Sequence, residues 1–248
     1  MRIISTSNER IRAVRRLHRG RERRHTMRTL IEGPNLVSAA LAANVVPAEI
    51  YSVEGGALVA RCRAAGSTVF EVSAPVLKAI STTVEPQDPV GVIAIPEQPE
   101  IDAVKTVVAV EIGDPGNAGT LIRTAGALGW QMALIGGVDP WSPKVLRASA
   151  GVQLLHPAVA ITSLDPLLAA GLRPVATTPS GGIDPGLLAE DEPLALLIGN
   201  EAHGLPVAMV EQCVASLTIP IADDVESLNA AVAGAIVMHT LTSGSTPE

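Results

Sequence analysis

Aromatic residues are scarce in this chain: they make up only 2% of its 248 residues, namely Tyr51, Phe70, Trp130 and Trp141. Four aromatic side chains are too few to build the base-stacking platforms of common single-strand RNA-binding modules. Cysteine is equally scarce, because the chain has only Cys62 and Cys213. Two cysteines form neither a disulfide framework nor a metal cluster, so the composition favours a reducing cytoplasm and predicts no metal site.

Long apolar runs are also missing. The longest candidate, 230–238, is far shorter than the ~20 residues that span a bilayer, and the charged N-terminus lacks the apolar core of a signal peptide. We therefore expect no contact with a membrane. Hydrophobic residues nevertheless make up 47% of the sequence, which is enough for an aliphatic core in one large domain or two small ones.

The net charge of −7 is distributed unevenly. Residues 1–28 hold ten of the 18 basic residues, all arginine, and only two glutamates, which gives +8, while the other 220 residues carry −15. Ile11, Val14 and Leu17 recur at three-residue spacing and predict one helix over 9–28. The asymmetry favours a basic element that binds a polyanion beside an acidic body, although a solvated basic helix without a partner fits the same pattern.

Residues 29–95 alternate between strand and helix patterns, which predicts a small α/β unit. Its strands are expected at 29–32, 48–53, 68–72 and 90–95, and its helices at 36–43, 58–65 and 75–81. A polar, proline-bearing stretch follows, and we place the domain linker at 97–104. The predicted domains are therefore 1–96 and 105–248.

A second α/β series follows the linker. Strands are expected at 106–112, 132–136, 153–159, 174–178, 194–198 and 216–221, and helices at 118–128, 143–150, 165–170, 206–212 and 228–242. The strands are apolar along their whole length, which is typical of a parallel sheet that is buried on both faces.

Three glycine-bearing or polar loops follow strands of this second series, at 113–125, 197–206 and 219–229. Open α/β sheets bind their ligands at the carboxyl ends of strands, so these loops are candidate site segments. None of them matches the dinucleotide-binding GxGxxG pattern or a Walker loop, which argues against a nicotinamide enzyme or a nucleotide triphosphatase. Taken singly, each loop could also be turn geometry, with Asn117 and Ser227 as helix N-caps.

The three loops together resemble motifs one, two and three of the SpoU-type RNA ribose 2′-O-methyltransferases of the SPOUT superfamily. The matching stretches are 117–125, 199–205 and 219–229, and the resemblance covers about 105–243. It extends weakly to the N-terminal part through 30–35 and 86–87, and also to 142–149. The resemblance implies an α/β fold: a C-terminal SPOUT domain with a parallel sheet and a deep trefoil knot, plus a small N-terminal α/β, ribosomal-protein-like substrate-binding domain.

The resemblance also implies S-adenosylmethionine as cofactor and a homodimer whose active site is shared across the interface. The cofactor-binding residues that it implies are Thr177, Thr178, Gly199, Asn200, Gly204, Ile219, Ile221 and Leu228. The catalytic residues that it implies are Asn117, Arg123, Glu201, Ser227 and Asn229. Arg123 from one protomer would hold a phosphate or activate the ribose hydroxyl, Asn117 would orient Arg123 or the ribose, and Glu201 would organise the loop and the arginine. Ser227 and Asn229 would complete the hydroxyl and phosphate site.

Arginines are the expected RNA contacts, because arginine binds phosphate bidentately. They are Arg10, Arg12, Arg15, Arg16, Arg19, Arg23, Arg24 and Arg147. We therefore expect an enzyme that methylates a ribose 2′-hydroxyl of structured RNA, with ribosomal RNA favoured over transfer RNA because of the separate N-terminal domain. Resistance to a ribosome-directed antibiotic would be one outcome of such a modification.

Departures from the motifs keep alternatives open. Ala202 stands where motif two usually has glycine, and Ile221 and Asp223 stand where motif three often has methionine and glycine. Asp223 and Asp224 bring negative charge close to the expected path of the RNA, which would suit an RNA-binding or assembly protein with weak catalysis. A transfer-RNA methyltransferase and a small-molecule methyltransferase are further alternatives, and His203 is an alternative general base because histidine titrates near neutrality.

Overall fold

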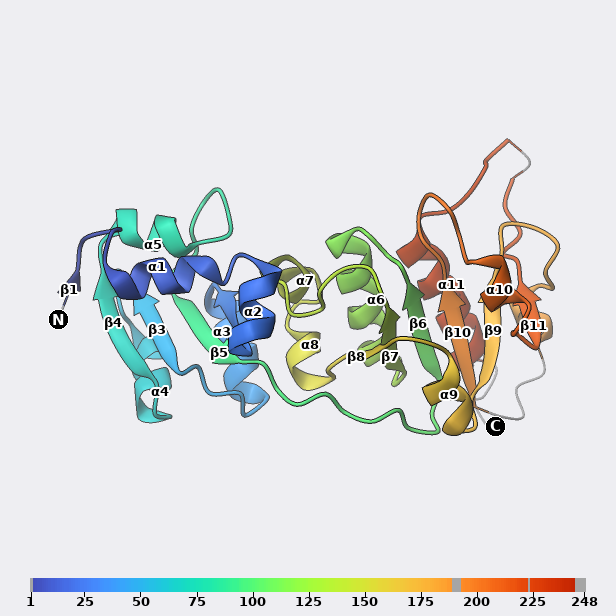
Figure 1. The fold of residues 1–248 in the computed structure, drawn as a ribbon, viewed down its shortest axis with the longest axis horizontal. Helices are drawn as coiled ribbons and strands as arrows, with labels where there is room; N and C mark the ends of the chain where they lie inside the picture. Colours follow the sequence, from blue (N-terminus) through green and yellow to red (C-terminus); the bar gives the residue numbers. More distant parts are fainter. Residues whose placement is uncertain (1, 189–192, 223, 244–248) are drawn as a thin grey trace. The chain divides into compact units, whose positions relative to one another are not determined.

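The computed structural model describes residues 2–188, 193–222 and 224–243, and it divides the chain into two compact units. The first unit comprises Met1–Glu97 and Asp139–Leu155, and the second comprises Gln98–Val138 and His156–Glu248. The segment Asp139–Leu155 was expected in the second domain, yet it packs with the first unit. Each unit is described separately below (Figure 1).

The first unit has a five-stranded sheet in the order β1-β4-β3-β5-β2. Its strands are β1 (Arg2–Ile3), β2 (Arg28–Glu32), β3 (Glu49–Ser52), β4 (Thr68–Val72) and β5 (Val90–Ala94). Strands β1, β3 and β4 are parallel, whereas β5 runs antiparallel to both β3 and β2. The two-residue β1 lay outside the predicted strands because it is too short to carry an alternating pattern.

Helices cover both faces of this sheet. They are α1 (Glu9–Arg16), α2 (Gly20–Thr26), α3 (Pro34–Ala42), α4 (Ala57–Ala64), α5 (Ala74–Ile80), α7 (Pro143–Ala148) and α8 (Val152–Leu155). Neighbouring residues of a strand point to opposite faces, and the core divides accordingly. Tyr51 joins the cluster that contains residues of α1 and α5, whereas Ile50 joins the cluster that contains residues of α3, α4, α7 and α8.

Two expectations for the first unit were wrong. The single helix expected over 9–28 is broken into α1 and α2, because Arg19 is extended and Arg23 turns back to donate to the carbonyl oxygens of Leu17 and His18. The strand expected at 153–159 begins as helix α8. Gly151, at a φ of +85°, lets the chain turn after α7, so that Leu154 packs into the core of the first unit.

The second unit has a six-stranded sheet in the order β11-β9-β10-β6-β7-β8. Its strands are β6 (Thr106–Val110), β7 (Gln131–Ile135), β8 (Val159–Ile161), β9 (Arg173–Thr177), β10 (Leu194–Ile198) and β11 (Ala215–Leu217). All neighbouring pairs are parallel, and every residue of the central strands β6 and β10 is buried. The predicted parallel sheet with buried strands is therefore confirmed.

The helical elements of the second unit are α6 (Pro115–Ala127), α9 (Asp165–Ala169), the 3₁₀ helix η1 (Pro185–Leu187), α10 (Val207–Val210) and α11 (Ala230–Ser243). α6 and α11 pack against each other. Gly234 allows this close packing, because a Cβ atom at this position would lie 2.6 Å from Cδ2 of Leu121 and 3.4 Å from side-chain atoms of Ile198. Among the described residues, no helix is long and apolar enough to cross a membrane.

Candidate functional site

A cavity of about 570 Å³ lies in the second unit, at the carboxyl ends of β9, β10 and β11. Its walls come from four chain segments, and they comprise Thr177, Thr178, Pro179, Ile198, Gly199, Asn200, Glu201, Ala202, Gly204, Leu217, Ile219, Ile221, Glu226, Ser227, Leu228, Asn229, Ala230 and Ala233. All eight residues that the sequence assigned to a cofactor line this one cavity. Three of the five expected catalytic residues, Glu201, Ser227 and Asn229, line it as well.

The carboxylate of Glu201 ties the second loop to the first. Its Oε1 atom accepts hydrogen bonds from the backbone N–H of Asp114 at 3.3 Å and from Nδ2 of Asn117 at 2.8 Å, and its Oε2 atom accepts from the backbone N–H of Gly113 at 3.2 Å. Glu201 therefore organises a loop, as expected. Its described partners are Asn117 and the backbone of the first loop, and Arg123 is not among them.

The third loop joins the same network through Asn229. Nδ2 of Asn229 donates to Oδ1 of Asn117 at 2.9 Å, and Oδ1 of Asn229 accepts from the backbone N–H of Ala231 at 2.9 Å. Asn229 thus caps the start of α11, a role that the sequence offered to Ser227. Likewise, the N-cap of α6 is Asp114, whose side chain accepts from the backbone N–H of Asn117. Both helices therefore begin at residues of the network.

The network keeps Glu201 ionised. Burial alone would raise the pKa of its carboxyl, but hydrogen bonds from Asn117 and from the backbone N–H groups outweigh burial and hold the pKa below the usual 4.5. Because the charged form accepts these bonds, Glu201 is an acceptor at neutral pH and has no proton to donate. Its place in the network is that of a positioning residue.

Close packing of backbone shapes the second loop. A Cβ atom at Gly199 would lie 2.3 Å from the carbonyl carbon of Gly204 and 2.5 Å from the backbone nitrogen of Leu205, so only glycine fits here. Asn200 and Gly204 exchange two backbone hydrogen bonds, and Gly204 has a φ of +67°. The Asn200 side chain donates to the carbonyl oxygen of Glu111 at 2.7 Å. Gly199, Asn200 and Gly204 thus give the cavity wall its form.

Threonine hydroxyls hold the wall at β9. Oγ1 of Thr177 donates to the carbonyl oxygen of Leu197 at 2.8 Å, and Oγ1 of Thr178 lies 3.3 Å from Oγ1 of Thr218. The sequence gave no role to Thr218, nor to the lining residues Glu226 and Ala233. Glu226 lies inside the third loop, and Ala233 follows Ala230 by about one helical turn, so the loop and helix assignments contained a signal for both.

Arg123 lies on the exposed side of α6, and it is absent from the cavity wall. It forms no hydrogen bond or ion pair with any described residue. His203 is exposed and is also absent from the wall, so the geometry gives no support to its role as a general base. Asp223 lies outside the described residues. Within those residues, no three His, Cys, Asp or Glu side chains come together as metal ligands.

The expected RNA-binding arginines fall into distinct groups in the first unit. Four of them line a hollow of about 300 Å³ along α1 and the turn that follows it, together with His18: Arg12, Arg15, Arg16 and Arg19. All four are exposed, as is Arg24 on α2. Arg16 lies 3.8 Å from Glu22, whereas Arg12, Arg15, Arg19 and Arg24 form no ion pair with any described residue. These four side chains are therefore available to a phosphate backbone.

Arg23 does not belong with the exposed arginines, which corrects the sequence-based assignment. Only 4% of its surface is exposed, and its guanidinium donates to Oδ2 of Asp139 from Nε at 2.9 Å and from Nη2 at 2.6 Å. Further bonds go to the carbonyl oxygens of Leu17 and His18. The donors of Arg23 are thus used inside the unit, and its role is to hold α1, α2 and Asp139 together.

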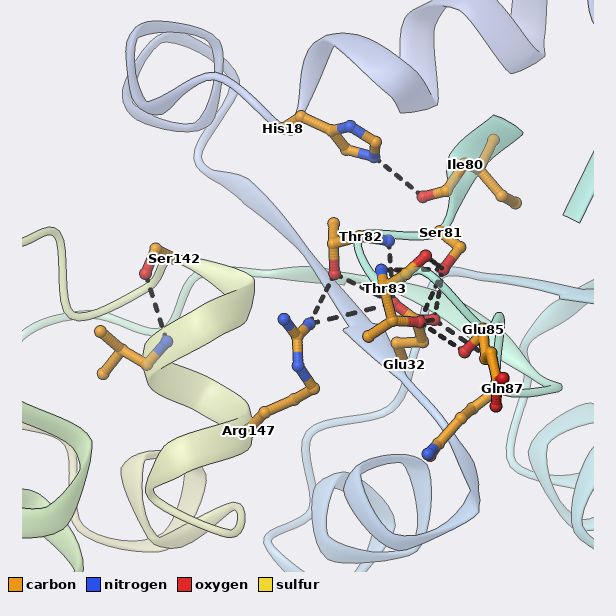
Figure 2. A network of polar contacts seen from close by, with 11 residues as sticks. His18, Glu32, Ile80, Ser81, Thr82, Thr83, Glu85, Gln87, Ser142 and Arg147 are labelled. Carbon is orange, nitrogen blue, oxygen red and sulfur yellow. Dashed lines mark hydrogen bonds and ion pairs between the residues drawn. The ribbon is translucent and has the colours of Figure 1, made fainter. Parts of the chain in front are cut away.

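Arg147 reaches from α7 toward a polar cluster at the end of β2, as Figure 2 shows. Its Nη1 atom donates to Oγ1 of Thr82 at 2.5 Å and lies 3.9 Å from Oε2 of Glu32. The carboxylate of Glu32 is almost fully buried and accepts from five donors, which are the hydroxyls of Ser81, Thr82 and Thr83 and the backbone N–H groups of Thr82 and Gln87. Arg147 is partly exposed but already engaged.

Known proteins resemble this chain along its whole length. The SpoU rRNA Methylase family model matches residues 105–239, and the MRM3-like substrate binding domain matches residues 8–91. The chain is 32% identical to 23S rRNA (guanosine(2553)-2'-O)-methyltransferase RlmP of Bacillus subtilis, with 96% of this chain and 98% of that protein aligned.

Solved structures agree with these matches. The AdoMet-bound rRNA methyltransferase from Sinorhizobium meliloti has a TM-score of 0.89 and 30% identity, covering 100% of this chain and 99% of that chain. The SpoU methyltransferase AviRb from Streptomyces viridochromogenes, in complex with AdoMet, has a TM-score of 0.87 and 25% identity, covering 96% of this chain and 98% of that one. A family model that accounts for over half of the residues, and a relative that aligns almost end to end, show that the chain belongs to the SpoU rRNA methylase family.

Proposed function

We propose that this protein transfers a methyl group from S-adenosylmethionine to a ribose 2′-hydroxyl of ribosomal RNA. The observation that carries this proposal is the joining of three motif loops by Glu201, Asn117 and Asn229 beside one cavity. One relative by sequence and one by structure, each aligned with 96% or more of this chain, are rRNA methyltransferases by name. The intact network also weighs against a protein of the same fold that only binds or assembles RNA.

The cavity suits S-adenosylmethionine in size and chemistry. Its volume of about 570 Å³ lies inside the range of small-molecule sites, about 300–1,000 Å³. Leu217, Ile219, Ile221 and Leu228 form apolar wall for the adenine, and Glu201 and Glu226 add negative charge that favours a cation. When bound, this cofactor supplies an electrophilic methyl group on a positively charged sulfur. Thr177, Thr178, Gly199, Asn200 and Gly204 would hold it as well.

The ribose hydroxyl must be aligned and must lose its proton during the reaction. A guanidinium carries only N–H donors and has no acceptor atom, so it cannot take up the proton of the hydroxyl. We therefore assign Arg123 to the phosphate next to the target ribose rather than to proton removal. Ser227 and Asn229 line the cavity beside Glu201 and would hold the hydroxyl, while Asn117 keeps Asn229 in place.

A homodimer would bring Arg123 of one protomer to the cavity of its partner. Two observations support this arrangement. Arg123 is exposed on α6 and has no partner among the described residues. Helix α11, which packs against α6, exposes Val232 to 47% and Ile236 to 40%, about one helical turn apart, so part of its surface is apolar. The deep trefoil knot of the SPOUT superfamily is part of the same proposal.

Ribosomal RNA is the preferred substrate of this proposal, and transfer RNA is the alternative. The substrate-binding model matches residues 8–91, and the exposed arginines of α1 belong to that part of the chain. We place the protein in the cytoplasm because its substrate is there. Resistance to a ribosome-directed antibiotic stays a prediction. Comparing growth of a deletion strain and a complemented strain in the presence of such antibiotics would test it.

The experiment combines labelled S-adenosylmethionine with total RNA from a strain that lacks the gene, followed by mapping of the methylated ribose. Arg123→Ala should abolish transfer and leave cofactor binding unchanged, as measured by calorimetry. Label confined to transfer RNA would replace ribosomal RNA as the substrate. Cofactor binding without transfer to any RNA would favour the assembly protein.

Mixed dimers test whether the site is shared between protomers. Arg123→Ala and Asn229→Ala subunits should each be inactive alone. If Arg123 acts in the partner's cavity, random mixing restores about a quarter of the sites, because half of the dimers are mixed and each has one complete site. A mixture that stays inactive, or Arg123→Ala that keeps near-normal turnover, contradicts the assignment.

A further inference from the structure

The first unit contains a cavity that the proposed methyl-transfer site does not use. Its volume is about 580 Å³, and it lies beside α1, α2, β2 and β3. The wall consists of Asn8, Glu9, Arg10, Ala13, Val14, Arg16, Leu17, Glu22, Thr26, Arg28 and Glu49. Three arginines and three glutamates are among its lining residues, whereas four arginines and His18 line the hollow along α1. Arg16 belongs to both walls.

Two of the four aromatic residues form a stack beside this cavity. The rings of Tyr51 and Phe70 lie 5.2 Å apart between centroids, at 21° to each other. The guanidinium of Arg10 lies over the Phe70 ring, 4.5 Å from its centroid. The Arg10 side chain is 46% exposed and lines the cavity. A planar cation that rests on a ring can stack its second face on a nucleotide base.

Ion pairs hold the guanidinium of Arg10 in this position. Its Nη1 atom lies 3.1 Å from Oε1 of Glu49, which also accepts from Nη2 of Arg28 at 3.1 Å, and the Tyr51 hydroxyl donates to Oε2 of the same carboxylate. Three donors therefore bond to Glu49, which fixes its carboxylate beside Arg10. Stacking on Arg10 is open to every base, since each base has a π face.

Charge separates this cavity from the hollow along α1. Its three arginines face three glutamates, and Arg16 lies 3.8 Å from Glu22. By contrast, Arg12, Arg15 and Arg19 form no ion pair with any described residue, so their charge is uncompensated. Phosphate groups are attracted to the uncompensated charge, whereas the charge-balanced cavity does not attract them over a neutral base.

We propose that the cavity binds one unpaired nucleotide of the RNA substrate, with its base stacked on Arg10 and the flanking phosphates on the exposed arginines of α1. This inference rests on the proposed function, because it takes RNA as the substrate. The nucleotide must be unpaired, since a base inside a duplex is already stacked on both faces and cannot reach the guanidinium. The first unit would thus recognise RNA that carries a loop or a bulge.

Arg10→Lys tests this proposal in the full-length protein. Lysine keeps the charge and the partnership with Glu49 but has no flat face. Binding of fluorescein-labelled hexauridylate and of a blunt RNA duplex is measured by anisotropy at several salt concentrations. We expect hexauridylate to bind about fivefold to tenfold more weakly, duplex binding to stay unchanged, and the salt dependence of both to be preserved because no charge is lost.

Arg12→Ala is the matched control, since Arg12 belongs to the unpaired arginines of the same helix. It should weaken both probes and reduce the slope of log K against log salt by about 0.7 for the single strand. Phe70→Leu is a second test, because it removes the ring beneath the guanidinium and leaves the charge of Arg10 in place. It should weaken hexauridylate alone, and thermal unfolding confirms that each variant is folded.

The proposal is overturned if Arg10→Lys binds hexauridylate as well as the wild type, or if it loses affinity for both probes equally. The latter result would show that Arg10 contributes only charge. Methyl transfer by the wild-type protein distinguishes failure of the nucleotide site from failure of the proposed function. If transfer to RNA occurs while Arg10→Lys behaves like the wild type, only the nucleotide site fails; if the wild type transfers nothing, the proposed function fails.

Discussion

The buried carboxylate of Glu32 makes a quantitative prediction for the stability of the first unit. Its side chain is only 2% exposed, yet it accepts five hydrogen bonds from the segment 81–87, and Arg147 lies 3.9 Å away. Glu32→Gln keeps the shape but replaces one acceptor oxygen by a donor amide. At least one backbone N–H, that of Thr82 or that of Gln87, then loses its acceptor, and the other bonds go to a neutral group instead of a charged one. Because bonds to a charged group contribute about 1.5–3 kcal/mol each, we expect a loss of about 3 kcal/mol or more.

The assay uses the distribution of tryptophan between the units. Trp141 lies in the first unit and Trp130 in the second, so a Trp130→Phe background makes fluorescence report on the first unit. With a urea m-value of about 1–3 kcal/mol/M, the unfolding midpoint of Glu32→Gln should fall by about 1–3 M. Glu71→Gln is the control. Glu71 lies 3.4 Å from Arg2 in a pair whose side chains are 59% and 55% exposed, so its loss should cost less than about 1 kcal/mol.

The pH dependence gives a second readout. Burial raises the pKa of Glu32, but hydrogen bonds from Ser81, Thr83, Thr82 and Gln87 outweigh it, so the pKa in the folded protein lies below 4.5. A lowered folded pKa stabilises the protein above the unfolded value and loses this effect as the pH falls through the folded value. The stability gap between wild type and Glu32→Gln should therefore be constant above pH ~5 and narrow in acid. Equal midpoints at neutral pH, or parallel acid profiles, would refute the reasoning.

Two further predictions concern the second unit. In a double-mutant cycle on unfolding, Asn117→Ala and Asn229→Ala should show a coupling of about 0.5–1 kcal/mol, because each side chain bonds the other; additive losses would contradict the network. Gly234→Ala should destabilise the protein by about 1–3 kcal/mol in thermal unfolding, since its Cβ would lie 2.6 Å from Leu121. Adding Leu121→Ala should cost less than its effect alone, and Gly234→Ala at wild-type stability would rule out the clash.

Local sequence patterns predicted the strands of the second unit well. Runs such as Leu194–Ile198 are apolar at every position and buried at every position, so composition and environment agree. The segment 153–159 shows where this reasoning ends. Most of its residues are apolar, which favoured a strand. The turn at Gly151 and the packing of Leu154 in the core of the first unit instead produce a helical turn. Long-range packing of this kind leaves no trace in the local pattern.

Arginines show a similar limit. Arg19, Arg23 and Arg24 look alike in the sequence, but only Arg23 is buried against Asp139, which lies 116 positions further along the chain. The sequence predicted a basic helix that binds a polyanion, and in the structure its Ile11, Val14 and Leu17 belong to the core of the first unit. Deleting residues 1–28 would therefore remove core as well as charge, and single arginine substitutions are the sounder test of RNA binding.

The residues of the candidate site were predicted from the motif resemblance. The hydrogen bonds that connect its loops were not. Spacing alone does not indicate that Glu201 and Asn117, 84 positions apart, share a hydrogen bond. The resemblance assigned Asn117 to orient Arg123 or the ribose and Glu201 to organise the loop and the arginine, but it did not indicate that Asn117 and Glu201 bond to each other. Which groups meet depends on how parallel strands bring their ends together, and that follows from the sheet order.

The segment Asp139–Leu155 determines how a chimera with the substrate-binding unit of a relative must be designed. The polypeptide passes between the two units after Glu97, after Val138 and after Leu155. Leu146 and Leu154 complete the core of the first unit, and the carbonyl oxygen of Trp141 accepts a hydrogen bond from Thr29. The substrate-binding unit therefore cannot be exchanged as one continuous segment. A functional chimera must carry two segments from the same parent, 1–97 and 139–155, because a single crossover would leave a foreign helix pair in the core.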